Sequence, residues 1–463
     1  MNENQELFEK MPVPKAVISL VVPTVISQLI TVIYNMADTF FIGQIGDPNQ
    51  VAAVSLCMPL FLLLTGMANL FGIGGSSLIS RSLGEGNLEK AKRVSVFSIW
   101  TSGIAALLYG VLVFAFRGYI LPVVGANEAT YDFCGRYLLW AVGIGAVPTV
   151  LSAAFSHLVR AEGYSRQASF GMAMGGILNI ILDPIFISLF GFEIAGAAIA
   201  TMLSNVAATL YFMVLILRKR KTTVLSFHPQ FYTLRMRIPF EVLLVGLPSC
   251  VMNLMGVFSN IFMNRLMVSY CNEAVAGIGI AKKIDMLAFA IATGMSQGVL
   301  PLIGYNYSSK NFKRMMSAVK TTFIYSLALA LISTLFLLTC AGPIVRAFID
   351  DPLTIQYGSL FQRIICVTCP CVSVSMIIIT LFQAVGKKVQ PLILSLLRKG
   401  ILDIPAMLLM NLWIGVNGIA WATPIADCTS MFIAIGLFIP FWKELKQDLI
   451  LGIPSSDNIL RSR

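Results

Sequence analysis

The chain has 463 residues, of which 57% are hydrophobic and only 12% charged, with a formal net charge of +11. Soluble globular proteins carry about 25% charged residues, so this composition excludes an ordinary soluble domain. The basic residues stand in short segments between apolar runs, which argues against a nucleic-acid partner.

Apolar runs long enough to cross a bilayer as helices, about 20 residues each, recur along the whole chain. We therefore predict an all-α polytopic membrane protein with 12 transmembrane helices, located in the cell inner (plasma) membrane and in contact with its lipids. The expected spans are 16–44, 51–80, 94–116, 133–158, 167–190, 195–217, 240–265, 275–304, 315–340, 357–384, 389–411 and 417–441. The start, MNENQELFEKMPVPK, lacks the basic and apolar segments of a cleaved signal, so we expect the first span to be retained.

Loop charge predicts the orientation of these spans. Lys and Arg gather before the first helix, after the second and fourth, and in the segment RKRKTTVLSFHPQFYTLRMRIP between the sixth and seventh. The alternate loops carry few basic residues. By the positive-inside rule, both termini are expected to be cytoplasmic.

The two halves of the chain resemble each other in sequence. LVVPTVISQL pairs with LVGLPSCVMNL, GILNIILDP with GILDIP, and GAAIAT with GIAWAT. We expect an N-terminal lobe over 1–217 (helices 1–6), a cytoplasmic linker over 218–238, a C-terminal lobe over 239–441 (helices 7–12) and a cytoplasmic tail over 442–463. Six-helix repeats of equal orientation predict a pseudo-twofold axis along the membrane normal, an arrangement typical of alternating-access transporters.

Ionisable residues inside a membrane are costly and serve as functional candidates by default. Asn179 and Asp183 are spaced i, i+4 and therefore share one face of the fifth helix. Pro184 cannot donate a hydrogen bond to the carbonyl of Ile180. A carboxylate, an amide and a carbonyl thus converge, and such oxygen ligands suit a proton or a hard cation such as Na⁺.

The first helix carries a polar stripe among apolar residues, formed by Gln28, Thr31, Asn35 and Asp38. Lipid tails offer no hydrogen-bond partners to these polar groups, so the stripe must face protein or water. Pro23 is expected to act as a kink and hinge below the stripe.

Asp38 and Asp183 are expected to lie at similar depths in the membrane. The first and fifth helices are expected to start in the cytoplasm, which places Asp38 and Asp183 in their outer halves. The sixth helix starts outside, which places Thr201 at a comparable depth. We therefore predict one cation-coupling cluster of Asp38, Asn179, Asp183 and Thr201, which is also the only metal site we expect, for Na⁺.

The second half has intramembrane acids with basic neighbours. Lys282 with Asp285, and Lys399 with Asp403, could neutralise each other locally, so structural pairing and functional use both stay open. Asp427 has no obvious local partner.

Signals for an enzyme are missing from the sequence. The two histidines share no catalytic or zinc-type arrangement with Cys or acidic residues, and no GxxxxGK[ST] phosphate loop occurs. The closest cysteines, Cys366, Cys369 and Cys371, lie in a span without acidic residues or His, so we interpret them as packing residues. We predict no enzymatic activity and no cofactor, with energy supplied by an ion gradient.

A family resemblance covers most of the chain. The segments ISQLITVIYNMADTFFIGQIG, VAAVSLCMPLF, SRSLGEGN and NIILDPIF, with repeated AxG turns, resemble the multidrug and toxic compound extrusion (MATE) family, and most closely its MepA-like and DinF-like bacterial members. The resemblance implies a two-lobed, V-shaped bundle that exports organic cations by antiport with H⁺ or Na⁺. In the DinF-like branch the coupling residues correspond to Asp38, Asn179, Asp183 and Thr201.

The C-terminal lobe departs from another branch of that family. The NorM-like branch uses acidic residues in helices 7 and 10, where this sequence offers Asn253 and Gln383 among its few polar groups. The possible sites of this lobe are Asn253 and Gln383, together with the intramembrane acids Asp285 and Asp403.

Two alternative functions would require other sequence features. A lipid-linked oligosaccharide flippase of the same superfamily would favour extra spans and a cavity lined by Arg and Lys, whereas a membrane-embedded enzyme would need a nucleophile, base or metal set. We expect a monomeric efflux transporter for lipophilic cations, because Met and aromatic surfaces adapt to varied shapes and aromatic faces attract cations.

Overall fold

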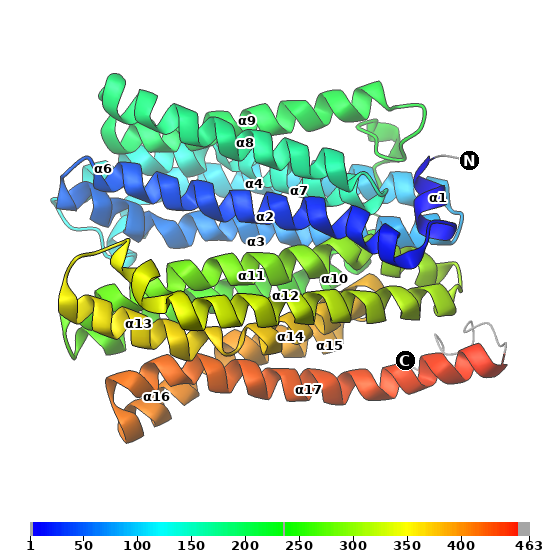
Figure 1. Cartoon of the computed structure of the whole chain (residues 1–463). Helices are drawn as coiled ribbons and strands as arrows, with labels where there is room; N and C mark the ends of the chain where they lie inside the picture. Colours follow the sequence, from blue (N-terminus) through cyan, green and yellow to red (C-terminus); the bar gives the residue numbers. More distant parts are fainter. Residues whose placement is uncertain (1–2, 235–236, 452–463) are drawn as a thin grey trace. The chain divides into compact units, whose positions relative to one another are not determined.

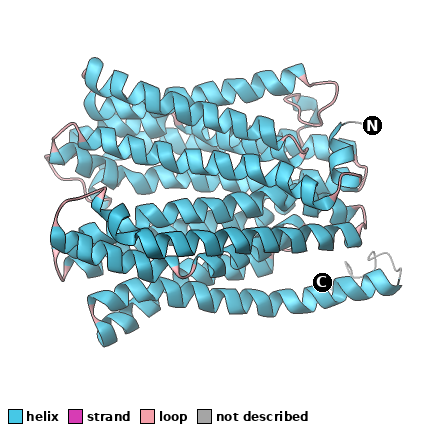
Figure 2. Ribbon diagram, viewed as in Figure 1, coloured by secondary structure: helices cyan, strands magenta, loops and turns pink. Residues whose placement is uncertain are grey.

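The computed structural model describes residues 3–234 and 237–451, and within this part the chain is helical without β-strands (Figure 2). The elements follow one another along the chain as shown in Figure 1. They are α1 (Glu3–Glu9), α2 (Val13–Gly43), α3 (Pro48–Gly84), α4 (Leu88–Ala115), α5 (Arg117–Val123), α6 (Tyr131–Leu138), η1 (Leu139–Ile144), α7 (Ala146–Ala161), α8 (Ser165–Pro184), η2 (Ile185–Leu189), α9 (Glu193–Arg218), η3 (Pro229–Phe231), α10 (Ile238–Val268), α11 (Asn272–Ser308), α12 (Phe312–Arg346), α13 (Pro352–Cys366), α14 (Cys369–Ala384), α15 (Val389–Leu396), η4 (Leu397–Ile401), α16 (Asp403–Ile414) and α17 (Val416–Leu451).

The all-α polytopic fold is confirmed. In the described ranges, 9 helices are long and apolar enough to cross a membrane, and up to 11 spans result if each of two bent helix pairs is one span. The bends are 47° between the helices on either side of Gly145 and 45° between α13 and α14. The remaining predicted span, 389–411, is formed by α15, η4 and α16.

The repeated AxG turns end helices in the same way in both halves. Gly163 follows α7 with φ +91°, and Gly386 follows α14 with φ +82°. These left-handed conformations are typical of the residue that ends a helix, and glycine adopts them without a steric penalty. The turn after α7 is the place from which α8 starts toward the candidate site.

The chain forms two compact units. Unit 1 comprises Met1–Val25, Ser80–Asn87 and Phe258–Arg463, and unit 2 comprises Ile26–Ile79 and Leu88–Val257. Three helices, α2, α3 and α10, therefore change unit part-way along their length, and in α2 the change falls just after Pro23. The predicted lobes, which rest on the sequence repeat, stay a prediction.

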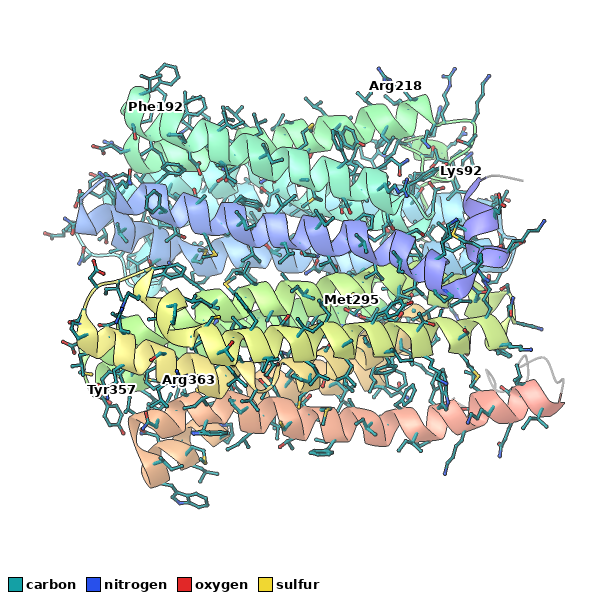
Figure 3. The ribbon with its side chains drawn as sticks, viewed as in Figure 1. Lys92, Phe192, Arg218, Met295, Tyr357 and Arg363 are labelled. Atoms are coloured by element: carbon teal, nitrogen blue, oxygen red, sulfur yellow. The ribbon has the colours of Figure 1, made fainter. Side chains whose placement is uncertain are left out.

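Unit 2 has a basic end and an aromatic end. Lys92 and Arg218 lie at one end of its helices, and Phe192 lies at the other, as Figure 3 shows. At the aromatic end, the rings of Phe186 and Phe192 stack with centroids 6.3 Å apart. Membrane proteins carry their loop charges and interfacial aromatic rings in such positions.

The core of unit 2 is built from small and aliphatic side chains on several helices. Fully buried members include Ala53, Leu64, Ala106, Ala146 and Ala197. Small residues allow helices to approach closely, which is how helices associate in a membrane. Polar side chains placed among such helices must find partners inside the bundle.

Candidate functional site

The centre of the site is Asn179, which lies on α8. Its amide nitrogen donates to Asp183 Oδ1 at 3.3 Å, one turn along the same helix. It also donates to the hydroxyl of Thr201 on α9 at 3.4 Å. One amide nitrogen carries two N–H groups, so both hydrogen bonds can form together. Three of the four predicted residues are therefore joined by hydrogen bonds.

Asp38 approaches this cluster from α2. Its carboxylate interacts electrostatically with that of Asp183. Two tyrosines are within electrostatic range as well, Tyr34 on α2 and Tyr137 on α6. The four predicted coupling residues thus lie in one region of unit 2.

Several oxygen atoms of the cluster have no hydrogen-bond partner. Within the described residues these are Asp38 Oδ1, Asn179 Oδ1 and Asp183 Oδ2, all of them buried. Buried polar atoms are normally satisfied, so such a set marks a place for a proton, a cation or water. Carboxylate, amide and hydroxyl oxygens fit a hard cation such as Na⁺, and either carboxylate could instead take up H⁺.

Irregular backbone follows the two α8 residues. α8 ends at Pro184, and the next residues form the π-helix η2. A π-helical turn is rare and often occurs at functional sites. Asp183 is fully buried at this irregular helix end, with 0% of its surface exposed.

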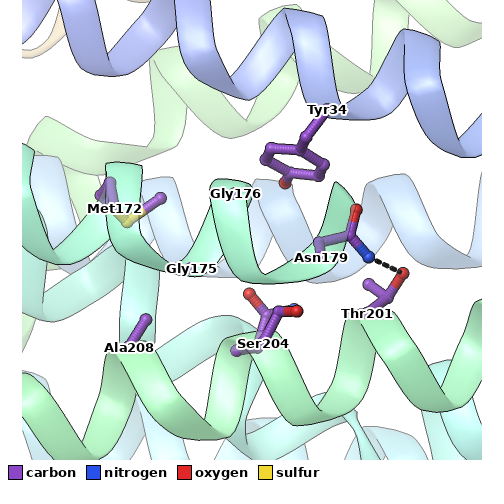
Figure 4. A pocket seen from close by; sticks show the side chains of 9 residues that line it. Tyr34, Met172, Gly175, Gly176, Asn179, Thr201, Ser204 and Ala208 are labelled. Atoms are coloured by element: carbon purple, nitrogen blue, oxygen red, sulfur yellow. Dashed lines mark hydrogen bonds between the residues drawn. The ribbon is translucent and has the colours of Figure 1, made fainter. Parts of the chain in front are cut away.

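A pocket opens beside Asn179 (Figure 4). It has room for about one water molecule, which is too small for a drug-sized ligand. Its lining comes from α2, α8 and α9 and comprises Tyr34, Met172, Gly175, Gly176, Asn179, Thr201, Ser204, Asn205 and Ala208. The pocket therefore suits water or an ion.

The other polar residues of α2 have different surroundings. The Thr31 hydroxyl donates to the backbone carbonyl of Ser27 at 2.9 Å. Asn35 is exposed, and Gln28 is half-buried. The structure brings Asp38 to the cluster and leaves the roles of Gln28, Thr31, Asn35 and Pro23 as predictions.

The charges of Lys282 and Asp285 interact, as their spacing suggested, although no ion pair joins the two side chains among the described residues. Asp403 accepts a hydrogen bond from Ser259 at 2.5 Å and is fully buried. Lys282 donates to the hydroxyl of Thr423 at 3.4 Å. The ion pairs found among the described residues include neither Lys282–Asp285 nor Lys399–Asp403.

The candidates of this half are divided between the two compact units. Asp285, Gln383 and Asp403 belong to unit 1, whereas Asn253 belongs to unit 2. Gln383 is buried, with 2% of its surface exposed. The functional use of these four residues stays a prediction.

Comparison with known proteins identifies the family. The MatE family model matches residues 23–185 and 248–409. The chain is 30% identical over 427 residues to the multidrug export protein MepA of Staphylococcus aureus strain MRSA252, covering 92% of this chain and 93% of that protein. The MepA protein of Staphylococcus saprophyticus is also 30% identical, over 426 residues. The chain belongs to the MatE family.

Solved transporter structures share the fold of this chain. A multidrug resistance MATE transporter of the MOP superfamily, in an outward-facing conformation, matches with a TM-score of 0.91 and 24% identity over 96% of this chain and 99% of that chain. A MOP superfamily transporter from Pyrococcus furiosus matches with a TM-score of 0.87 and 24% identity, over 96% of this chain and 99% of that chain. The family match and the apolar helices identify this MATE protein as a multi-pass membrane transporter.

Sequence reasoning missed two residues of this MATE transporter. Arg398 is buried in η4, and its Nε donates to Asp427 Oδ1 at 2.7 Å, which supplies the partner that Asp427 lacked. Tyr137 on α6 lies within electrostatic range of Asp38 and Asp183. A search for intramembrane basic residues as well as acidic ones would have found Arg398. Only the fold shows that Tyr137 is near the cluster.

Proposed function

We propose that this transporter exports lipophilic organic cations in exchange for H⁺ or Na⁺, with Asp38, Asn179, Asp183 and Thr201 as its coupling site. The observation that carries the proposal is that the Asn179 amide donates to Asp183, whose carboxylate interacts electrostatically with that of Asp38. Its relatives named as multidrug export proteins support export of drugs.

Coupling follows from the charge of this cluster. Two carboxylates that interact in a region of low dielectric constant are costly when both are ionised. A proton or Na⁺ that enters from outside lowers this cost, and loss of the ion to the cytoplasm restores it. Binding of the ion shifts the protein from one conformational state to another only if the two states differ in their affinity for the ion.

The substrate binds outside the Asn179 pocket, since that pocket accommodates only about one water molecule. Ion and drug then influence each other through the conformation of the protein. Pro23 in α2 lies close to the residue where this helix passes from unit 1 to unit 2, which supports a hinge at this position.

Substrate exchange in proteoliposomes tests the proposal. Purified transporter is reconstituted with an aromatic dye cation or a quaternary ammonium ion, and a pH gradient or a Na⁺ gradient is imposed separately. We expect one gradient, or each of them, to drive uphill movement of the cation. Cation movement that depends on neither gradient, or transport restricted to anionic compounds, would contradict the proposal.

A further inference from the structure

The pocket beside Asn179 extends from the coupling site toward one end of unit 2. α8 runs from Ser165 to Pro184, so Met172 and Gly175 precede Asn179 by one to two turns. α9 runs in the opposite direction, and Ser204 and Asn205 follow Thr201 by about one turn. Both helices therefore place the pocket between the coupling site and the end of unit 2 that loop charge predicts to be cytoplasmic.

Two glycines create the space for this pocket. A Cβ atom at Gly176 would lie 2.8 Å from Tyr34 Cδ1, and one at Gly175 would lie 3.3 Å from the Ala208 Cβ. Glycine at both positions lets α8 approach α2 and α9 while a polar gap remains. Asn179, Ser204 and Asn205 supply polar side chains to that gap.

Asn205 connects the pocket to α7. Its amide nitrogen donates to the hydroxyl of Thr149 at 2.9 Å. Its amide oxygen accepts from the Ser152 hydroxyl at 3.5 Å. Thr149 and Ser152 are buried, with 9% and 1% of their surfaces exposed. The polar groups therefore continue from the pocket into the helix beyond it.

α7 carries these groups along one face to its end. Thr149, Ser152, Ser156 and Arg160 follow one another at spacings of three and four residues, which places them on one side of the helix. Ser156 accepts from Arg160 Nη2 at 3.1 Å, and both residues are buried. Glu162 lies just beyond the end of α7 at Ala161.

Unsatisfied atoms occur at both ends of this row. At the coupling site they are Asn179 Oδ1 and Asp183 Oδ2, and near the other end they include Arg160 Nε and the hydroxyls of Ser165 and Ser169. Buried polar atoms normally have hydrogen-bond partners, so these atoms mark positions at both ends of the row where buried water can bind.

We propose that this row, defined by Asn205, Thr149, Ser152 and Ser156, is a hydrated relay through which a proton leaves the coupling site for the cytoplasm. The inference rests on the proposed function. The proton departs from Asp183, leaving its carboxylate ionised, and passes to water at the unpartnered Asp183 Oδ2 and from there to water in the pocket. Each water or hydroxyl accepts one proton and donates another, so that one proton emerges at the end of α7 for each one that enters.

The relay is tested with Asn205→Leu, Asn205→Ala and a matched control. Thr209→Val is the control, because the Thr209 hydroxyl joins the same two helices by donating to the carbonyl of Pro148 at 3.0 Å. Leucine would fill the path with an apolar group, whereas alanine leaves space that water can occupy beside Thr149 and Ser152. Substrate affinity and pH-driven export are measured for each variant in proteoliposomes.

We expect Asn205→Leu to slow pH-driven export at least about tenfold, equal to about 1.4 kcal/mol in the barrier, with substrate affinity unchanged. Asn205→Ala should be clearly faster than Asn205→Leu, and Thr209→Val should match the unmodified protein. Equal rates for Asn205→Leu and Thr209→Val would overturn the relay, as would equal losses in the leucine and alanine variants. Export driven by Na⁺ and not by pH would overturn it too.

Asp183→Asn, measured in the same vesicles, separates the two proposals. If Asp183→Asn keeps normal gradient-driven export, the coupling site itself is wrong. If it loses that export while Asn205→Leu keeps it, only the relay is wrong.

Discussion

Asn179 donates hydrogen bonds to Asp183 and to Thr201, at 3.3 and 3.4 Å. The amide thus links one carboxylate of the acidic pair to a second helix. Any change in the charge of Asp183 alters the strength of the hydrogen bond that it accepts, because a hydrogen bond to an ionised acceptor is stronger than one to a neutral acceptor. Ion binding at this site can therefore reach α9 through one residue.

Neutralising either carboxylate should uncouple transport. We expect Asp183→Asn and Asp38→Asn each to lower gradient-driven export by about 5- to 150-fold, the range that corresponds to coupling free energies of about 1–3 kcal/mol. Asn179→Ala and Thr201→Ala should have milder effects. Export is measured in proteoliposomes at matched protein content, with membrane insertion checked for each variant. Normal export by the double variant Asp38→Asn/Asp183→Asn would remove this site from the mechanism.

The close contact between α2 and α8 at Gly176 should also be important for coupled export. A Cβ atom there would lie 2.8 Å from Tyr34 Cδ1 and 3.0 Å from Ile30 Cγ2, so Gly176→Ala must shift these side chains of α2, which lie on the same helix as Asp38. We expect impaired coupled export. Gly135→Ala is the control, since a Cβ atom there meets nothing within 4 Å. Equal activity of the two variants would show that α2 tolerates the displacement.

The buried ion pair of Arg398 and Asp427 should govern stability. Its side chains are 2% and 3% exposed. Removing one partner, as in Asp427→Asn or Arg398→Met, leaves the other charge buried and should cost about 3–5 kcal/mol of unfolding free energy. The double variant Arg398→Met/Asp427→Leu should recover much of that loss. Thermal unfolding in detergent compares the three variants, and a double variant as unstable as the sum of the single ones would contradict this.

The segment after α9 should respond to pH through Glu162. The carboxylate of Glu162 accepts hydrogen bonds from the Thr223 hydroxyl and the Val224 amide, each at 2.5 Å. Burial raises the pKa of Glu162 to about 7, although these hydrogen bonds and Lys219 lower it in part. Glu162 thus binds its proton more tightly when the segment after α9 is packed against it than when that segment is detached. Packing of the segment is therefore strongest at low pH and weakens as pH rises through about 7.

Hydrogen exchange measures this effect. After correction for intrinsic exchange rates, the amide of Val224 should be less protected at pH 8 than at pH 5. Glu162→Gln should remove the difference, because glutamine does not titrate. As a control, Glu89→Gln alters an exposed pair with Arg93 and should leave the pH response intact. A pH response that persists in Glu162→Gln would assign it to another group.

Membrane orientation is tested by labelling single cysteines. Lys221 and Glu128 are both exposed and lie in segments predicted to be cytoplasmic and external, respectively. In intact cells, an impermeant thiol reagent should label Glu128→Cys and should not label Lys221→Cys until the membrane is opened. Labelling of Lys221→Cys in intact cells would reverse the assigned topology.

The sequence by itself determined the helices and the local part of the site. Length and apolar composition are properties of each segment alone, so the predicted spans coincide with helices in the described residues. The contact of Asn179 with Asp183 follows from a spacing of four residues on one helix. The equivalent turns at Gly163 and Gly386 also follow from local sequence, because glycine alone adopts their backbone conformation without strain.

Only the tertiary structure decided which polar groups meet across helices. Arg398 pairs with Asp427, Asp403 accepts from Ser259, and Lys282 donates to Thr423. Local spacing suggested other partners for Lys282 and Asp403 and none for Asp427. The rotation of each helix about its axis selects the partner, and that rotation depends on how small and large side chains of neighbouring helices pack together. No segment contains this information alone.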